Sequence, residues 1–252
     1  MEYKYRIKAF AFDGDGVAYV GDKLIKETIN AIKALQRKGI AVYMATNTSS
    51  GTREQVYKRL KGIVDKENII TAADLMLEYI EKNYNYVWAI SNPKIKRAIN
   101  KLGIKINEHK AECVCISFHR RHEFNDIAIG LRLLLNKRPL LSANIDRYYL
   151  RPEGVVPGNG FITKAFESVV NVKAKYFGKP NPEMLFRIAK KENIKINELA
   201  LVGDMMETDV QAAKNAGCLS IYVNNGVFQV IRVKPDIETS YKRLERDLFS
   251  LI

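Results

Sequence analysis

Short apolar segments alternate with helical segments at both ends of the chain, and this alternation limits the possible folds more than any other feature. After the apolar residues 9–12, a helical pattern over 26–39 places Ile29, Ile32 and Leu35 on one stripe. The same order recurs, with expected strands at 40–47, 199–202 and 219–223 and expected helices at 52–62, 182–194, 208–217 and 240–252. Strands joined through helices pair in parallel, with helices on the faces of the sheet. We therefore predict an α/β fold with a Rossmann-like parallel core sheet.

About a hundred residues between the two halves carry strand and helix signals of their own. Helical patterns span 92–103 and 161–171, and an apolar strand signal covers 111–118. A stretch of this length is rarely a structureless loop in a compact protein, so we interpret it as an inserted α/β domain. We predict a discontinuous core and an inserted domain, with the core at 1–79 and 176–252 and the insertion at 80–175.

Three helix starts carry capping signals. Thr52 and Gln55 have the spacing of a capping box, and so do Thr208 and Gln211. Asn181 is predicted to cap a helix whose first residue is the following proline.

The composition is that of a folded protein without a disulfide framework. Hydrophobic residues make up 47% of the 252 residues, which is enough for a core, and no apolar run approaches the roughly 18 residues of a membrane span. The N-terminus lacks the apolar stretch of a signal peptide. Cys113, Cys115 and Cys218 are too few for a disulfide scaffold, and the first two are expected inside a buried strand. We expect a soluble, cytoplasmic protein with no membrane partner, in which any metal is bound by oxygen.

The formal net charge of +13 raises the question of nucleic-acid binding. The lysines are spread along the expected helices rather than gathered in one tract, and no signature of a nucleic-acid-binding module accompanies them. A generally basic surface would also attract small anionic substrates. We expect no nucleic-acid partner.

Polar residues follow several of the expected strands at the point where each strand ends. They are Asp13-Gly14-Asp15-Gly16, Thr46-Asn47, Lys179, and Gly203-Asp204 with Asp209. The carboxyl ends of parallel strands meet at one edge of a sheet, where such folds bind ligands. Clustered carboxylates repel one another unless a cation or a proton compensates them. Carboxylates, a hydroxyl and a lysine together are the groups that phosphoryl transfer requires.

Each of these motifs also has an ordinary structural interpretation. Asp-Gly is a common turn, Thr46 could simply end a strand, and Lys179 could be a surface lysine. Asp204 could cap the segment that follows, and Asp209 could complement a helix dipole. A shared site is favoured because all of the motifs fall at one edge of the predicted sheet.

The order and context of the four motifs resemble the haloacid dehalogenase superfamily of aspartate-nucleophile phosphatases. The resemblance covers the whole core, and the insertion is similar to the C2-type cap domain of the NagD-type, 4-nitrophenylphosphatase-like branch. The similar stretches are "ATNTSSGTREQ", "SANIDRYYLRPEGVVPGNG", "GKPNPEMLF" and "VGDMMETDVQAAKNAG".

The resemblance implies a role for each matching residue. Asp13 would attack phosphorus and become an aspartyl-phosphate, while Asp15 would protonate the leaving alcohol and then activate water. Thr46, the backbone N–H of Asn47 and Lys179 would bind the phosphoryl oxygens. A metal ion would be held by Asp13, the carbonyl of Asp15 and Asp204, with Asp209 supporting them. That ion would be Mg²⁺, with Mn²⁺ and Co²⁺ as alternatives, because oxygen ligands discriminate weakly among these ions.

Two segments of the insertion are candidates for substrate selection. Asn144, Asp146 and Arg147 lie in a stretch, "ANID", that resembles a family motif. The loop His119–His122 departs from the family pattern. It is either a solvated basic loop or a recognition element in which Arg120 or Arg121 binds a second anionic group of the substrate.

These observations lead to one main functional hypothesis. We expect an Mg²⁺-dependent phosphomonoester hydrolase that acts on small phosphorylated metabolites, with a cap domain that closes over the site. A phosphotransferase using the same residues is the first alternative, and a non-catalytic basic nucleic-acid-binding protein is the second. The sequence does not fix the oligomeric state, but cap-mediated dimers occur among the proteins that it resembles, so a homodimer formed through the cap is one assembly to test.

Overall fold

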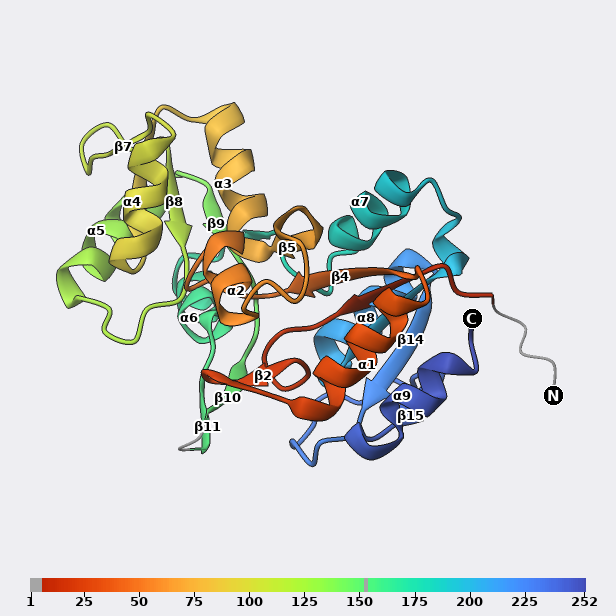
Figure 1. Cartoon of the computed structure of the whole chain (residues 1–252). Coiled ribbons are helices and arrows are strands. Elements are labelled where there is room, and N and C mark those ends of the chain that lie inside the picture. The colour runs from red at the N-terminus through yellow and green to blue at the C-terminus, as the bar shows by residue number, and fades with distance from the viewer. Residues whose placement is uncertain (1–5, 152–153) are drawn as a thin grey trace.

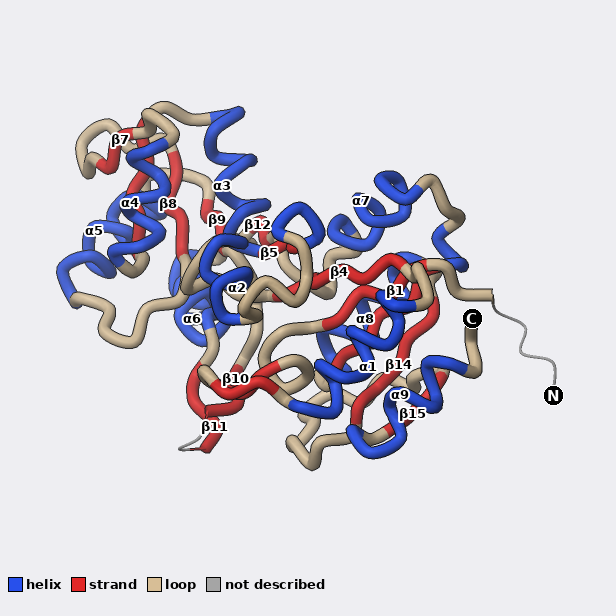
Figure 2. The backbone as a smooth tube through the Cα atoms, in the orientation of Figure 1, coloured by secondary structure: helices blue, strands red, loops and turns tan. Residues whose placement is uncertain are grey.

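Two separate parallel sheets, each flanked by helices, make up most of the structure (Figure 1). The structure is a computed structural model that describes residues 6–151 and 154–252. In both parts the strands run through the middle and the helices lie outside them, as Figure 2 shows. The predicted α/β class, with a parallel core sheet, is confirmed.

The first of these, the core sheet, has the strand order β15-β14-β13-β1-β4-β5, and every neighbouring pair is parallel. Its strands are β1 (Ala9–Phe12), β4 (Ala41–Thr46), β5 (Ile69–Thr71), β13 (Leu199–Gly203), β14 (Leu219–Val223) and β15 (Ile237–Thr239). The accompanying helices are α1 (Lys26–Arg37), α2 (Arg53–Arg59), α7 (Glu183–Glu192), α8 (Gln211–Ala216) and α9 (Tyr241–Phe249), with short turns η1 (Lys66–Asn68), η2 (Ile196–Glu198) and η3 (Met206–Val210). Strands from both ends of the chain therefore join in one sheet, with β1 beside β13.

Alternate residues of β1 belong to two different hydrophobic clusters. Phe10 and Phe12 point to the side that α1 and α9 cover, whereas Ala9 and Ala11 point to the side of α7 and α8. All four side chains are fully buried. Successive strand residues face opposite sides, so a strand covered on both faces must be apolar throughout. This is why β1 has no polar residue before Asp13.

The second sheet lies in residues 86–176, which we call the cap region. Its order is β12-β9-β8-β6-β7, again with parallel neighbours throughout. The strands are β6 (Tyr86–Ile90), β7 (Lys105–Ile106), β8 (Cys113–Ile116), β9 (Leu140–Ser142) and β12 (Lys175–Tyr176). This sheet is covered by helices α4 (Pro93–Lys101), α5 (Phe124–Leu135) and α6 (Asn159–Val170). Two antiparallel hairpins complete the fold of the chain. One pairs β2 (Tyr19–Val20) with β3 (Lys23–Leu24), and the other pairs β10 (Tyr148–Arg151) with β11 (Gly154–Pro157). Cys113 and Cys115 are buried free thiols in β8, as expected.

Helix α3 (Ala72–Asn83) connects the core sheet to the cap region. It follows β5 directly and leads into β6 (Figure 1). Its buried face belongs to a hydrophobic cluster that contains residues of both sheets. The predicted boundaries at 79/80 and 175/176 fall within α3 and within β12 respectively, and as domain limits they stay predictions.

Hydrogen bonds at the helix starts differ in part from the capping predictions. Gln55 accepts from the Thr52 N–H at 2.7 Å, as a capping box requires. Asn181 does accept a bond from Glu183 N, at 3.0 Å, but α7 begins at Glu183, one residue later than predicted. The prediction that Thr208 caps a helix is wrong, because the π-helical turn η3 already begins at Met206 and Thr208 lies inside it.

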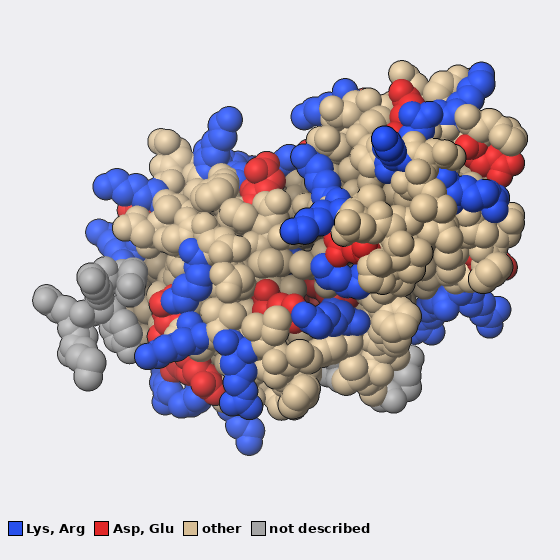
Figure 3. Space-filling model, turned by 180° about the vertical axis from the view of Figure 1, so that it is seen from behind, with Lys and Arg blue, Asp and Glu red and all other residues tan. Residues whose placement is uncertain are grey.

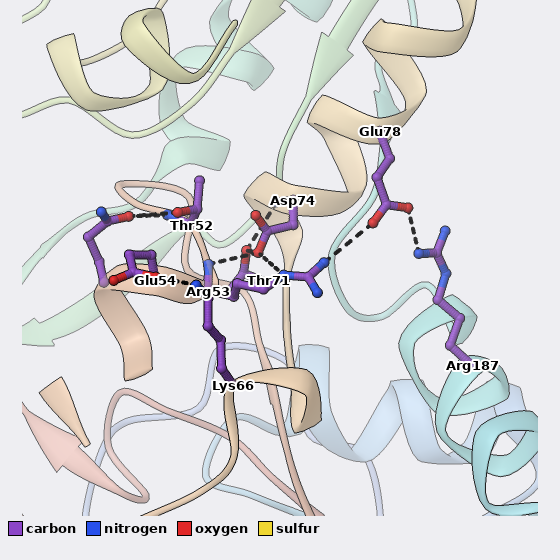
Figure 4. Close-up of polar contacts among 9 residues, drawn as sticks. Thr52, Arg53, Glu54, Lys66, Thr71, Asp74, Glu78 and Arg187 are labelled. Carbon is purple, nitrogen blue, oxygen red and sulfur yellow. Dashed lines mark hydrogen bonds and ion pairs between the residues drawn. The ribbon is translucent and has the colours of Figure 1, made fainter. Parts of the chain in front are cut away.

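A cap that was not predicted starts α3, and Figure 4 shows it. The Thr71 hydroxyl oxygen accepts from Asp74 N at 3.0 Å, and the Asp74 carboxylate accepts from Arg53 N at 2.8 Å. Beyond it, Glu78 of α3 forms an ion pair with Arg187 of α7. These contacts tie α3 to α2 and α7 at its core end.

Candidate active site

The candidate site lies where β1, β4 and β13 of the core sheet end. Asp13 and Asp15 follow β1, Thr46 ends β4, and Asp204 follows β13, so the sheet brings together three of the motifs. All of these side chains line one cavity together with Lys179. The cavity also takes residues from the cap region, so both parts of the chain enclose it.

Lys179 is the fixed positive charge of the site. Its Nζ lies 2.6 Å from Asp13 Oδ1 and 2.6 Å from Asp209 Oδ1, and its side chain is only 1% exposed. Burial by itself lowers the pKa of Lys179, but the charges of Asp13 and Asp209 outweigh it and raise that pKa. Lys179 therefore stays protonated between two carboxylates, and it is not the surface lysine of the ordinary interpretation.

Three buried carboxylates lie close together beside this lysine. Asp13, Asp204 and Asp209 each offer an oxygen, and these oxygens all lie within 4.8 Å of one another. Burial raises the pKa of Asp13 to about 7, with Lys179 opposing and Asp209 adding to the shift. Burial followed by the charges of Asp209 and Asp13 raises the pKa of Asp204 well above its ordinary value. The cluster carries more negative charge than Lys179 can balance, which favours a bound cation.

The two oxygens of Asp204 have different surroundings. Oδ2 accepts a hydrogen bond from Asn225 Nδ2 at 2.7 Å, whereas Oδ1 is buried and has no partner among the described residues. In Asp209, by contrast, Oδ1 meets Lys179 and Oδ2 accepts from Met205 N at 3.0 Å. A hard divalent cation fits this donor set. Asp13 and Asp204 offer ligand atoms, and Asp209 forms an ion pair with Lys179 beside them.

Two glycines allow the acidic side chains to approach the backbone. Gly16 has φ +82°, and a Cβ there would lie 2.2 Å from Asp204 Oδ2. A Cβ on Gly203 would lie 2.2 Å from the Cβ of Asp209. Any larger residue at either position would displace a carboxylate of the cluster.

Three polar residues near Asp204 were not among the predicted site residues. Besides its bond to Asp204, Asn225 Nδ2 donates to Gly16 O at 3.2 Å, and the Tyr241 hydroxyl donates to the same carbonyl. The buried Gln229 donates to Asp204 O at 3.0 Å and accepts from Met206 N at 2.8 Å. Only the position of Asn225, two residues after β14 and at the same edge of the sheet, could have indicated any of them.

The Thr46-Asn47 motif connects the site to Lys179 and to the cap region. Thr46 Oγ1 accepts from Thr48 N at 3.2 Å. The Asn47 amide accepts from Lys179 N at 2.7 Å and donates to Lys179 O at 3.0 Å. The same amide donates to Asp146 Oδ1 at 2.7 Å. Asn47 thus holds the backbone of Lys179 through its side chain, in addition to the phosphate contact predicted for its N–H.

The predicted substrate-selecting residues lie in two different places. Asn144 and Asp146 line the cavity, and the buried Asn144 amide donates to Asn47 O and Ser49 Oγ. Burial raises the pKa of Asp146, whose side chain retains partial exposure. Arg147 forms an ion pair with Glu207 of η3 at 2.9 Å and does not line the cavity. Arg120 and Arg121 are exposed and do not line it either.

Two protein-family models match the sequence of this chain. A family model described as haloacid dehalogenase-like hydrolase matches residues 10–105, and a second model of haloacid-dehalogenase-like hydrolases matches residues 176–242. Together they cover more than half of the chain and contain all four motifs. Residues 106–175, which lie between the two matches, belong to the cap region.

Several characterised proteins are similar over nearly the whole chain. The 5'-nucleotidase YutF of Bacillus subtilis is 26% identical over 236 residues, which is 92% of each chain. The acid sugar phosphatase of Staphylococcus aureus is 28% identical over 226 residues, 87% of each chain. The crystal structure of a 4-nitrophenylphosphatase from Thermotoga maritima superimposes with a TM-score of 0.85 at 25% identity, covering 96% of this chain and 97% of that one. The chain therefore belongs to the haloacid dehalogenase superfamily, and its similarity to these phosphatases extends over nearly its whole length.

Proposed function

We propose that the protein is an Mg²⁺-dependent phosphomonoester hydrolase that acts on small phosphorylated metabolites through an aspartyl-phosphate. The observation that carries this proposal is the Asp13 carboxylate held at 2.6 Å by buried Lys179, beside an Asp204 oxygen that has no hydrogen-bond partner within residues 6–151 and 154–252. This arrangement supplies a nucleophile, a fixed positive charge and room for a cation within one cluster.

The chain's own residues account for the proton and charge movements. Asp13 attacks phosphorus as the bond to the leaving oxygen breaks, and Asp15 gives a proton to that oxygen. Water then attacks the phosphorus of the aspartyl-phosphate, Asp15 accepts a proton from that water, and the bond between phosphorus and the Asp13 oxygen breaks to release phosphate. Lys179 offsets the negative charge that Asp13 and the phosphoryl group share, and Thr46 with the Asn47 N–H orients the phosphoryl oxygens.

The metal proposal follows from the donor set. Asp13, Asp204 and the carbonyl of Asp15 would hold Mg²⁺, which supplies a positive charge toward the phosphoryl oxygens when bound. Asp209 supports the site through Lys179 and Met205 rather than as a direct ligand. Mn²⁺ and Co²⁺ have similar preferences for oxygen and are the alternatives to compare in an assay.

Small substrates are favoured because the cavity is shared between the core sheet and the cap region. Asn144 and Asp146 of the cap region line the cavity and hydrogen-bond to Asn47 at the end of β4, so the cap region covers part of the strand ends. The relatives named above as 5'-nucleotidase and acid sugar phosphatase support this substrate class.

The experiment that tests the proposal is hydrolysis of 4-nitrophenyl phosphate by the wild-type chain with Mg²⁺, with EDTA and with Asp13→Asn in parallel. We expect turnover that EDTA removes and that the substitution lowers by at least three orders of magnitude, since no nucleophile remains. Adding a primary alcohol separates hydrolase from phosphotransferase, because only the latter converts the alcohol to its phosphate ester. A folded wild type that is inactive with Mg²⁺, Mn²⁺ and Co²⁺ would contradict the proposal.

A nucleic-acid-binding function finds little support on the surface that Figure 3 presents. Lys and Arg side chains there are scattered over both parts of the molecule, with acidic side chains between them rather than in one continuous basic strip. Duplex binding measured at two salt concentrations tests this alternative, because binding through phosphate contacts weakens steeply with salt. The cytoplasmic location and the homodimer through the cap stay predictions. Among the described residues, no helix is both long and apolar enough to cross a membrane.

A further inference from the structure

Ser49 lines the cavity, although none of the proposed catalytic steps involves it. It belongs to the loop between β4 and α2, two residues after Asn47, and it is only 4% exposed. Its hydroxyl group meets the cap region, because Phe118 N lies 3.3 Å and Asn144 Nδ2 lies 3.1 Å from Ser49 Oγ. The core loop and the cap region are therefore in contact through this hydroxyl at the cavity wall.

Both partners of the Ser49 hydroxyl can only donate to it. Phe118 contributes a backbone N–H, which cannot accept a hydrogen bond. Contacts at both ends fix the orientation of the Asn144 amide, because its Oδ1 accepts from Asp146 N at 3.2 Å and its Nδ2 also donates to the carbonyl of Asn47. The end of the Asn144 amide that faces Ser49 is thus the NH₂ group.

The hydrogen of the Ser49 hydroxyl is left for another acceptor. A serine hydroxyl has two lone pairs that accept and one hydrogen that it can donate. The two donors from the cap region occupy both lone pairs. Within residues 6–151 and 154–252, this hydroxyl donates to no other residue. Its hydrogen must therefore point away from both donors, and the cavity is the space that Ser49 borders.

We propose that Ser49 is a specificity-determining residue, whose hydroxyl hydrogen is directed into the cavity by Phe118 N and Asn144 and binds an acceptor atom on the leaving group. The leaving group is favoured over the phosphoryl group because both contacts of this hydroxyl are with the cap region, whereas the proposed nucleophile Asp13 follows a core strand. A leaving group with only hydrocarbon at this point would leave a buried donor without a partner, which costs free energy. This inference rests on the proposed phosphatase function and adds to it a residue that selects among leaving groups.

The test compares pairs of alkyl phosphates in which an ether oxygen replaces one methylene group. The pairs are 2-methoxyethyl with butyl phosphate, and 3-methoxypropyl with pentyl phosphate, which place the oxygen at two distances from phosphorus. An ether oxygen accepts a hydrogen bond, donates none and carries no charge. For the pair whose oxygen reaches Ser49, we expect the ratio of kcat/KM, ether over alkyl, to fall roughly 2- to 12-fold in Ser49→Ala, the usual effect of one neutral hydrogen bond.

Two further variants separate the direction of the hydrogen from the mere presence of a hydroxyl. Asn144→Asp replaces the amide donor with a carboxylate oxygen that accepts from Ser49, so the ratio should fall although Ser49 is intact. Ser50→Ala is the matched control and should keep the wild-type ratio. Ser50 lines the cavity from the same loop, but in the described part of the chain the cap region bonds to its backbone carbonyl and not to its hydroxyl. Melting temperatures and hydrolysis of butyl phosphate report whether each variant is folded and active.

Three results would overturn the inference separately from the phosphatase function. The first is a Ser49→Ala protein with wild-type ratios in both pairs, and the second is an unchanged ratio in Asn144→Asp. The third is competitive inhibition by inorganic phosphate that weakens in Ser49→Ala as much as kcat/KM falls for every ester, because the hydroxyl would then bind the phosphoryl group. If 4-nitrophenyl phosphate is not hydrolysed with any divalent metal, the phosphatase proposal fails and this inference fails with it.

Discussion

Asp204 illustrates how much of the site depends on single hydrogen bonds. Asn225 occupies its Oδ2, which leaves Oδ1, an oxygen with no hydrogen-bond partner in the described part of the chain, as the one available to a cation. The same amide contacts Gly16 O, so it fixes the distance between the loop after β1 and the loop after β13. Asn225 is in this sense a positioning residue for the proposed metal site.

We predict that Asn225→Ala weakens Mg²⁺ binding about 10- to 100-fold, the usual effect of removing a residue that orients a metal ligand. Titration calorimetry of the purified protein with Mg²⁺ measures this without reference to turnover. Asn224→Ala is the control, because the neighbouring asparagine bonds instead to Glu238 at 3.0 Å. An Asn225→Ala protein with wild-type Mg²⁺ affinity would show that Asp204 does not need this bond.

Among the helices, α3 is held by polar contacts that differ in how far their side chains are exposed. The Asp74 side chain is 12% exposed and accepts hydrogen bonds from Arg53 N and the Thr71 hydroxyl. The Glu78 side chain is 35% exposed and forms ion pairs with Arg53 and Arg187 (Figure 4). Buried hydrogen bonds at a helix start contribute more to stability than exposed ion pairs, which gain little over their hydration.

Asp74→Ala is therefore expected to lower the free energy of unfolding by about 1–2 kcal/mol. Glu78→Ala should cost less than about 1 kcal/mol despite its shorter contact with Arg187. Chemical denaturation of the two variants and the wild type gives both values. Equal losses, or a larger loss in Glu78→Ala, would contradict this ranking.

The loop between β8 and α5 carries a histidine whose protonation opposes folding. Burial and then the nearby His119 lower the pKa of His122, with Lys96 acting in the same direction and Asp126 against it. The unfolded chain thus binds a proton at this position more readily than the folded chain, and stability falls as the pH drops through the ordinary histidine range.

We predict that the wild type loses more thermal stability between pH 7.5 and pH 5 than His122→Gln does. Melting temperatures at both pH values, in the absence of metal, provide the comparison. His109→Gln removes a histidine whose side chain is 84% exposed and serves as the control. A variant with the same pH-dependent loss as the wild type would mean that His122 does not contribute.

At the scale of the whole molecule, the cap region contacts the core through neighbouring residues of one segment. Arg147 donates to Glu207 of η3 through two contacts, at 2.9 and 3.1 Å, and the Tyr148 hydroxyl donates to Phe228 in the loop after β14. Because η3 lies between Asp204 and α8 and contains Asp209, these contacts link the cap region to the acidic cluster.

Breaking this ion pair should affect substrate binding more than chemistry. We expect Glu207→Ala to raise KM for 4-nitrophenyl phosphate by roughly 1.5- to 5-fold with little change in kcat, in line with a partly exposed pair. Exchanging the charges, with Arg147→Glu and Glu207→Arg in one chain, should restore part of the loss. If the exchanged pair is as impaired as the sum of its two single changes, the contact does not hold the cap region closed.

The amino-acid sequence alone predicts the α/β class, the parallel core sheet and the group of residues at its carboxyl edge. These follow from local patterns: Ala9–Phe12 is apolar on both faces, and Asp13 must lie where the strand ends. Periodicity and strand order act over short distances along the chain, so they can be read from neighbouring residues. Helix caps follow less directly from the sequence, because Thr208 has the spacing of a capping box yet lies within a π-helical turn.

The residues that complete the site are identified from the three-dimensional packing and not from local patterns. Asn225 contacts Gly16 across 209 positions and Tyr241 does so across 225, and no local pattern of either residue announces such a partner. The sequence places Lys179 among the predicted site residues, but only packing shows that it is buried between two aspartates. Arg147, a predicted substrate-selecting residue, forms an ion pair with Glu207, a partner that no local pattern indicates. Side-chain partners far apart in sequence depend on how whole elements pack, because local propensity carries no information about distant neighbours.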